Sequence, residues 1–179
     1  MKVRMAGYGG QGQVTAGILL GHAAVNEGRN ALQTQSYGSA TRGGLTTCDV
    51  AIADGDIHEV NPEQFDVLVA FSQEAYDTYL PLLAPDGVLV YEADLVTLDD
   101  AVTQKAVGAP TTRLAKVEMG KQICANVVML GFLVGAVEEL VSTEAVDRAM
   151  KEQLAPRIVL LNQKAFSLGV EHGREAARG

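Results

Sequence analysis

The chain has few of the residues that bind metals or crosslink a fold. Its 179 residues include two cysteines, three histidines and no tryptophan. Cys48 and Cys124 are far apart and neither belongs to a Cys-x-x-Cys pair, which excludes an iron–sulfur or structural zinc site built by this chain alone. The histidines show no metal-ligand spacing. We therefore expect no metal site and interpret both cysteines as buried thiols in a reducing compartment.

The chain also lacks excess positive charge and a long apolar run. Its formal net charge is -8, and the 14 lysines and arginines are scattered singly, so no basic patch is available for nucleic acid. The longest apolar stretch, Ile123 to Val137, contains Asn126 and two glycines and is shorter than the ~18–20 residues of a membrane span. The N-terminus has no signal-peptide pattern. We expect a cytoplasmic protein without nucleic-acid or membrane partners.

In the first half, short apolar segments alternate with segments of helical periodicity. Helical spacing over residues 13–27 places Val14, Ile18, His22 and Val25 on one face. Nearly continuous apolar runs are typical of parallel strands covered on both faces. The predicted strands are 2–6, 31–33, 45–53, 65–71 and 87–91, and a further helix over 73–83 is closed by Pro85-Asp86-Gly87.

Two connections in this half have distinct patterns. Residues 35–44 are rich in glycine and hydroxyl side chains, which predicts a loop. The strand over 45–53 ends at Asp54-Gly55, a hairpin-type turn, so residues 57–60 are expected to be the returning strand.

The second half is predicted to be helical over 115–140, 143–154 and 156–169, with Thr143 as an N-cap. No repeat or linker divides the chain. We predict a single domain over residues 1–179. Its fold class is α/β, a Rossmann-like layered sheet with mostly parallel strands and a hairpin, and the helical C-terminal half packs on that sheet.

A glycine-rich segment follows the first predicted strand and precedes the first helix. Gly7-x-Gly9-x-x-Gly12 matches the Rossmann pattern, in which glycines let the backbone approach a phosphate and the helix N-terminus offers N–H groups to it. Glycines also serve close helix–strand packing. A dinucleotide site would add an acidic residue at the end of the second strand, and residues 32–36 contain none, which disfavours an ordinary dehydrogenase.

A second group of candidate residues is Ser36-Tyr37-Gly38 with Arg42-Gly43-Gly44. In a doubly wound sheet these residues would lie beside the first glycine loop, at the carboxyl ends of the strands. Arg42 would supply a planar cation for phosphate or carboxylate, or would be a surface arginine in a turn.

The remaining polar residues predict no catalytic set. Asn126 and Asn162 lie in apolar helical segments, where each is expected to cap a loop or a neighbouring helix end. Asp66, Glu92 and Asp94 lie beside strands and are expected to end strands or face solvent. No Ser/His/Asp arrangement or paired carboxylate motif is present.

These residues together resemble one family, the gamma subunit of pyruvate and 2-oxoacid:ferredoxin oxidoreductases. The opening segment through Gly7-Tyr8-Gly9-Gly10-Gln11-Gly12 resembles the start of that subunit, and its Gly-Gly-Gln-Gly is more specific than a bare Rossmann loop. Ser36-Tyr37-Gly38 with Arg42-Gly43-Gly44, and the segment from Asn126 to Gly131, are similar to further family signatures. Family members often carry Pro before the Ser-Tyr-Gly and Pro-Glu after it, where this chain has Gln35 and Ser39-Ala40.

The resemblance implies a subunit of an enzyme complex. The complex oxidatively decarboxylates a 2-oxoacid to an acyl-CoA, with thiamine diphosphate, magnesium and iron–sulfur clusters on partner subunits and ferredoxin as the electron acceptor. The implied partners are alpha, beta and ferredoxin-like subunits, with a homodimer of this chain when isolated, and the isolated chain is expected to be inactive. 2-Oxoglutarate is the first choice of substrate; pyruvate, branched-chain oxoacids and indolepyruvate remain open.

Within that complex this chain is expected to help bind coenzyme A and to assemble the subunits. The implied cofactor-binding residues lie in the two glycine segments and in the apolar helix: Gly7, Gly9, Gly10, Gln11, Gly12, Ser36, Tyr37, Gly38, Arg42, Gly43, Gly44 and Asn126. Subunit contacts by Arg42 are the alternative role for that residue. The alternative function is a stand-alone Rossmann nucleotide-binding module or dehydrogenase.

Overall fold

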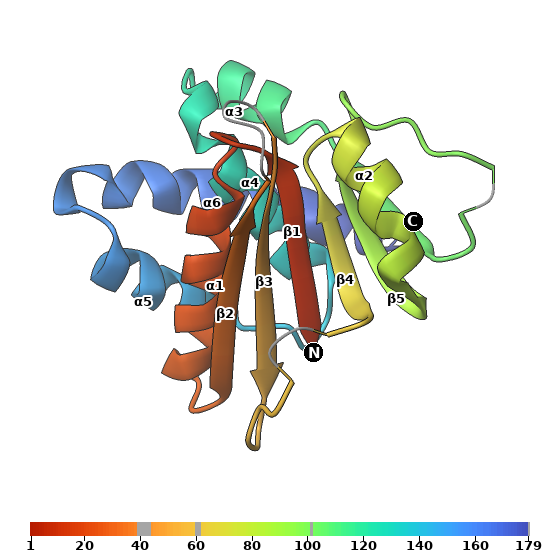
Figure 1. Ribbon diagram of the computed structural model, residues 1–179. Helices are drawn as coiled ribbons and strands as arrows, with labels where there is room; N and C mark the ends of the chain where they lie inside the picture. Colours follow the sequence, from red (N-terminus) through yellow and green to blue (C-terminus); the bar gives the residue numbers. More distant parts are fainter. Residues whose placement is uncertain (39–43, 60–61, 101, 179) are drawn as a thin grey trace.

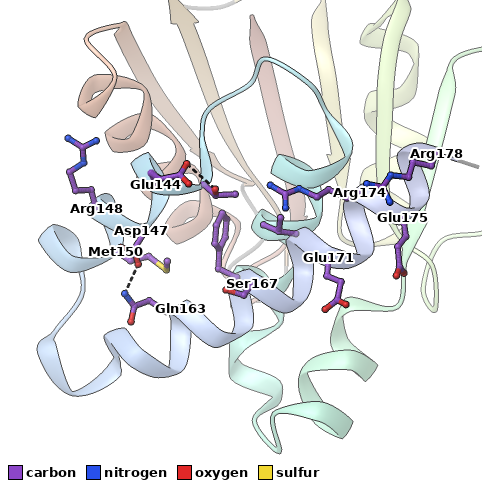
Figure 2. A pocket seen from close by; sticks show the side chains of 13 residues that line it. Glu144, Asp147, Arg148, Met150, Gln163, Ser167, Glu171, Arg174, Glu175 and Arg178 are labelled. Atoms are coloured by element: carbon purple, nitrogen blue, oxygen red, sulfur yellow. Dashed lines mark hydrogen bonds between the residues drawn. The ribbon is translucent and has the colours of Figure 1, made fainter.

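A six-stranded sheet forms the centre of the computed structural model, which describes residues 1–38, 44–59, 62–100 and 102–178. The strand order is β2-β3-β1-β4-β5-β6 (Figure 1). β1, β4, β5 and β6 pair in parallel, whereas β3 is antiparallel to both β1 and β2. The α/β class with a mostly parallel sheet is thereby confirmed. The strands are β1 (Lys2–Tyr8), β2 (Asn30–Tyr37), β3 (Leu45–Ala53), β4 (Phe65–Ala70), β5 (Leu83–Glu92) and β6 (Lys105–Ala109).

The hairpin joins β2 and β3, and its predicted position was wrong. Residues 57–59 form no strand, Val60 lies outside the described residues, and β3 instead pairs back onto β2. The predicted loop over 35–44 was also wrong at its start, because Gln35–Tyr37 complete β2. β2 is one of the two edge strands of the sheet, and an edge strand tolerates polar side chains that a central strand would have to bury.

Helices cover the two faces of the sheet unequally. Along β4, Val67 and Val69 join one apolar cluster while Leu68 and Ala70 join the other, as the alternation of a strand requires. The larger cluster joins the sheet to α1, α4, α5 and α6; the smaller joins it to α2, which lies in front of the sheet beside β4 and β5 in Figure 1. The helices are α1 (Gln13–Asn26), α2 (Gln73–Tyr79), α3 (Thr111–Glu118), α4 (Ala125–Ala136), α5 (Thr143–Gln153) and α6 (Pro156–Arg178), with 3₁₀ turns at Leu80–Leu82 and Gln122–Cys124.

α1 buries a different face from the predicted one. Leu19 and Leu20 are fully buried with neighbouring alanines, whereas Val25 is 55% exposed. The buried face carries Gly17, where a Cβ atom would lie 2.2 Å from the Cys48 Sγ of β3. The small residues therefore let α1 approach the sheet closely. The close packing of this face stabilises the helix on the sheet more than burial of the larger side chains on the other face would.

The second half differs from the prediction at its element boundaries. β6 was not predicted, and α6 continues to Arg178 rather than ending near Gly169. Ser142, not Thr143, is the N-cap of α5, and its Oγ accepts a hydrogen bond from the Ala145 N–H at 3.2 Å. α3 begins at Thr111, and a break after Glu118 separates it from α4.

Residues 85–87, the predicted helix stop, lie inside β5. The β4–β5 register shifts between Phe65 and Val67, so residues 85–87 of β5 interrupt the regular pairing with β4. Among the helices of the described ranges, none combines the length and apolarity that crossing a membrane would require.

Candidate functional site

The glycine loop lies at the carboxyl end of β1 and leads directly into α1. Gly10 and Gly12 have φ angles of +95° and +84°, a region that strains other residues. Gly12 is the N-cap position of α1 and supplies no side-chain cap. The first-turn N–H groups of α1 therefore have no intrahelical acceptor and carry the positive end of the helix dipole. This geometry suits an anion such as a phosphate.

Gln11 holds the loop to the sheet through both ends of its side-chain amide. Its Oε1 accepts a hydrogen bond from the Tyr8 N–H at 2.6 Å, and its Nε2 donates to the Phe71 carbonyl at 3.0 Å. Gly7 lies between them, where a Cβ atom would be 2.5 Å from the Gln11 Oε1. Because Phe71 follows β4, Gln11 joins the ends of two parallel strands. Its predicted contact with a cofactor stays a prediction.

Gln13 is a site residue that the sequence reasoning missed. It is 1% exposed, and its Nε2 lies 3.1–3.3 Å from the carbonyl oxygens of Gly7, Tyr8 and Thr46. Its buried Oε1 has no hydrogen-bond partner among the described residues. The side chain thus ties the start of α1 to β1 and β3. The one indication in the sequence was an amide side chain directly after Gly12. The helical pattern predicted this residue as an ordinary member of the first helical turn.

Asn126 at the start of α4 touches the glycine loop. Its Nδ2 donates to the Gly12 carbonyl at 3.2 Å, and a Cβ atom on Gly12 would lie 2.6 Å from the same Nδ2. The expectation that Asn126 caps a loop or helix end agrees with this bond. Asn162 instead donates to the Ile158 carbonyl at 2.8 Å within its own helix, so the expectation was wrong there.

The second predicted group meets the first at the same edge of the sheet. Ser36 and Tyr37 end β2 and Gly38 follows it; β2 runs in the same direction as β1 with β3 between them. The Gly9 N–H donates to the Gly44 carbonyl at 3.4 Å, so the two segments are in direct contact. The predicted neighbourhood is correct, although an antiparallel strand separates β1 from β2. Arg42 and Gly43 lie outside the described residues.

The carboxylates beside the strands make structural contacts: Glu92 and Asp94 lie at the carboxyl end of β5, whereas Asp66 lies at the amino end of β4. The Oε2 of the buried Glu92 accepts three hydrogen bonds at 2.6–3.0 Å. The donors are the Thr111 hydroxyl, the Thr112 hydroxyl and the Thr112 N–H. Asp94 pairs with Arg113 at 3.3 Å. Asp66 accepts from the Lys2 N–H at 2.6 Å. These bonds hold strand ends and the start of α3.

The Tyr8 phenol faces an acidic neighbour. Hydrogen bonding to the Glu74 carboxylate raises the pKa of the exposed Tyr8 hydroxyl above its ordinary value. The phenol is protonated at neutral pH, as a tyrosine ordinarily is, and its hydroxyl faces the Glu74 carboxylate. Within the described ranges, no three or more His, Cys, Asp and Glu side chains gather as metal ligands would.

Comparisons with known proteins identify the family of the chain. Residues 2–172 match the family described as pyruvate ferredoxin/flavodoxin oxidoreductase. The chain is 39% identical to the 2-oxoglutarate synthase subunit KorC of Methanothermobacter thermautotrophicus, over 99% of this chain and 97% of that protein.

Two solved structures share the fold. The gamma subunit of keto/oxoacid ferredoxin oxidoreductase from Geobacter sulfurreducens is 37% identical, with a TM-score of 0.87 over 98% of this chain and 99% of that one. The 2-oxoglutarate:ferredoxin oxidoreductase of Magnetococcus marinus, solved with 2-oxoglutarate, coenzyme A and succinyl-CoA, is 22% identical, with a TM-score of 0.87 over 98% of this chain and 31% of that one. The chain therefore belongs to the pyruvate ferredoxin/flavodoxin oxidoreductase family, as a gamma-type subunit of a 2-oxoacid:ferredoxin oxidoreductase.

Proposed function

We propose that this chain is the gamma subunit of a 2-oxoglutarate:ferredoxin oxidoreductase and that it binds coenzyme A for that complex. The choice of oxoacid is supported by the 39% identity to a 2-oxoglutarate synthase subunit along nearly its whole length. When bound in the complex, thiamine diphosphate supplies decarboxylation and the iron–sulfur clusters carry electrons to ferredoxin. Alpha, beta and ferredoxin-like subunits hold those groups and magnesium.

The residues of this chain fit a phosphate group better than a redox centre. Cys48 and Cys124 are both buried, and burial raises the pKa of the Cys48 thiol to about 11, so it stays protonated rather than becoming a metal-binding thiolate. The open end of α1 is the observation that carries the coenzyme A proposal. The N-cap position supplies no side-chain bond to its first-turn N–H groups, and among the described residues, apart from Gly10 and its two chain neighbours, no atom lies within 4 Å of a Cβ atom placed on Gly10. A phosphate of coenzyme A can therefore reach the loop backbone.

The complex itself is tested by purification from the native host. Anaerobic purification of the tagged chain is expected to recover the three partner subunits in stoichiometric amounts. The recovered complex should reduce ferredoxin with 2-oxoglutarate and coenzyme A faster than with pyruvate, branched-chain oxoacids or indolepyruvate. Recovery of the colourless chain alone would contradict the subunit role, and preference for another oxoacid would contradict only the substrate.

A charge at Gly10 tests the coenzyme A site. Gly10→Asp is expected to raise the KM for coenzyme A roughly tenfold while leaving kcat near its original value, because a carboxylate in the loop repels the phosphates. Gly10→Asn is the matched control, since asparagine has nearly the same shape, tolerates positive φ about as well and carries no charge. Initial rates of the purified complex at varied coenzyme A give both constants.

The two variants separate charge from shape. A KM raised equally by both would show that the loop tolerates no side chain, without evidence for an anion. An unchanged KM in the aspartate variant would place coenzyme A elsewhere, even when the complex assembles and turns over normally.

A further inference from the structure

β2 forms one border of the sheet. In the described part of the chain its one strand neighbour is β3, and Figure 1 shows it at the end of the row of strands. α1 packs on the face of β3 and β2, with Gly17 against Cys48 of β3. The helix therefore covers one face near this border and leaves the outer backbone groups of β2 without a strand.

The hydrogen-bond pattern identifies which backbone groups face outward. The Gly38 N–H donates to the Leu45 carbonyl at 2.8 Å, and residues of an antiparallel pair alternate between bonded and non-bonded positions. The even-numbered residues of β2 therefore bond to β3. The same alternation turns even-numbered residues of β3 toward β1, and the Ile52 N–H indeed donates to the Met1 carbonyl at 2.8 Å. The outward N–H and C=O groups belong to Ala31, Gln33, Gln35 and Tyr37.

This border lacks the features that protect edge strands from pairing. Its eight residues, Asn-Ala-Leu-Gln-Thr-Gln-Ser-Tyr, contain no charge and no proline. Edge strands that stay single are usually short or carry lysine, proline or a bulge. The opposite border follows that rule: β6 has five residues, begins with Lys105 and is followed by Pro110. The contrast indicates that β2 accepts a strand.

The side chains of β2 are complementary to a second copy of the same strand. Antiparallel self-pairing over residues 31–37 puts Gln33 opposite Gln35 and Ala31 opposite Tyr37, all with outward backbone groups, and puts Thr34 opposite Thr34. Amide and hydroxyl pairs of this kind stabilise neighbouring strands, and no like charges meet although the chain carries a net charge of -8. A twofold axis through Thr34 makes the contact closed and symmetric.

We propose that the isolated chain forms a dimer in which β2 pairs antiparallel with β2 of a second copy, making one continuous twelve-stranded sheet from two sheets of six. The pairing uses the outward backbone groups of β2 rather than the first-turn N–H groups of α1, and its tests need no coenzyme A.

Amide hydrogen exchange of the isolated full chain, followed by NMR across a concentration series, tests the pairing directly. In a monomer the Thr34 and Ser36 amides exchange slowly and the outward Gln33 and Gln35 amides exchange fast. In the dimer we expect the outward amides to become protected as concentration rises, in step with dimer mass in sedimentation equilibrium. A monomer at ~100 µM, or fast exchange of the outward amides in a dimer, overturns the proposal.

A proline at an outward position is the mutational test. Gln35→Pro removes one outward N–H group without removing a bond to β3, and it should weaken dimerisation at least tenfold, corresponding to about 1.4 kcal/mol. Gln35→Ala keeps the N–H group and loses only the Gln33–Gln35 side-chain pairs, so it should weaken dimerisation less than the proline variant does. Protection of the Thr34 amide in the proline variant verifies that the β2–β3 pairing persists. Equal dimerisation of both variants, with that protection retained, overturns the proposal.

Discussion

Gly169→Ala is expected to lower the free energy of unfolding by about 3 kcal/mol, because the α4–α6 contact has no room for a methyl group. A Cβ atom on Gly169 would lie 2.0 Å from the Val128 carbonyl oxygen and 2.7 Å from the Phe132 nitrogen. Both are backbone atoms of α4, which cannot rotate away as a side chain can. The helices must therefore separate. For a chain of this size the loss corresponds to a fall in Tm of roughly 6–12 °C.

The contact is built reciprocally from both helices. Gly131 and Gly135 of α4 and Gly169 and Gly173 of α6 each face the backbone of the other helix, with added Cβ atoms 2.0–2.4 Å from a carbonyl oxygen. A spacing of four residues places each pair on one face of its helix. The apolar side chains beside them, including Phe132 and Phe166, are buried in the main cluster. Separation at any one glycine therefore loosens a shared part of the core.

Gly21→Ala in α1 is the matched control. A Cβ atom there would have its nearest neighbour at 3.9 Å, the Val50 Cγ1, which is an ordinary contact. The variant is expected to be neutral or more stable by up to about 1 kcal/mol, because alanine favours a helix over glycine. Urea unfolding of both variants measures the difference. Equal stability changes would show that α4 and α6 do not cross with their backbones in contact.

The effect should extend to the candidate site. α4 begins beside Asn126, whose amide bonds to the Gly12 carbonyl. A shift of α4 away from α6 would move this amide relative to the glycine loop. The Gly169→Ala complex is therefore expected to bind coenzyme A less tightly even where it remains folded.

The sequence predicted those parts of the fold that depend on local pattern. The apolar run at Phe65–Phe71 contains β4, because a strand buried on both faces is apolar throughout. The strand–glycine–helix pattern at the start of the chain is the β1–α1 unit, because its conformation requires glycine at fixed positions. The outer strands were predicted less well for the opposite reason: only residues 31–33 of β2 were predicted as a strand, and β6 was not predicted. β2 carries polar residues and β6 contains a glycine, so their identity as strands depends on a neighbour far along the chain.

In the candidate site, too, the features that depend on local pattern were predicted and those that depend on distant partners were not. The two glycine segments were placed together correctly, since strand ends converge at one edge of a sheet. The roles of Gln11 and Gln13 depend on Phe71 and Thr46, partners that no local pattern indicates. The burial of α1 likewise followed from Gly17 and Cys48 meeting across the interface, not from the spacing of large apolar residues.

Arg4→Met is expected to lower the free energy of unfolding by about 3 kcal/mol, because it leaves the nearly buried Asp49 carboxylate without its partner. Arg4 of β1 lies directly opposite Asp49 of β3, and its Nε and Nη2 donate to the two carboxylate oxygens at 2.8 and 2.6 Å. The side chains are 11% and 12% exposed. The guanidinium also stacks on the rings of Phe65 and Tyr79, with its Cζ 3.9 and 4.7 Å from their centroids. Arg4→Lys keeps the charge but not the paired bonds or the planar stack, so it should recover only part of the loss.

Chemical denaturation of a double-mutant cycle separates the ion pair from simple packing. The double variant Arg4→Met with Asp49→Leu should lie within about 1 kcal/mol of the original chain, because no charge is left unpaired and the apolar side chains fill the site. Arg113→Met breaks an ion pair whose side chains are 64% and 38% exposed and should change stability by less than about 0.5 kcal/mol. Additive losses at Arg4 and Asp49 would contradict the coupling. Recovery in the double variant would show that the paired charges between β1 and β3 supply little net stability and that the loss in Arg4→Met comes from the unpaired Asp49 carboxylate.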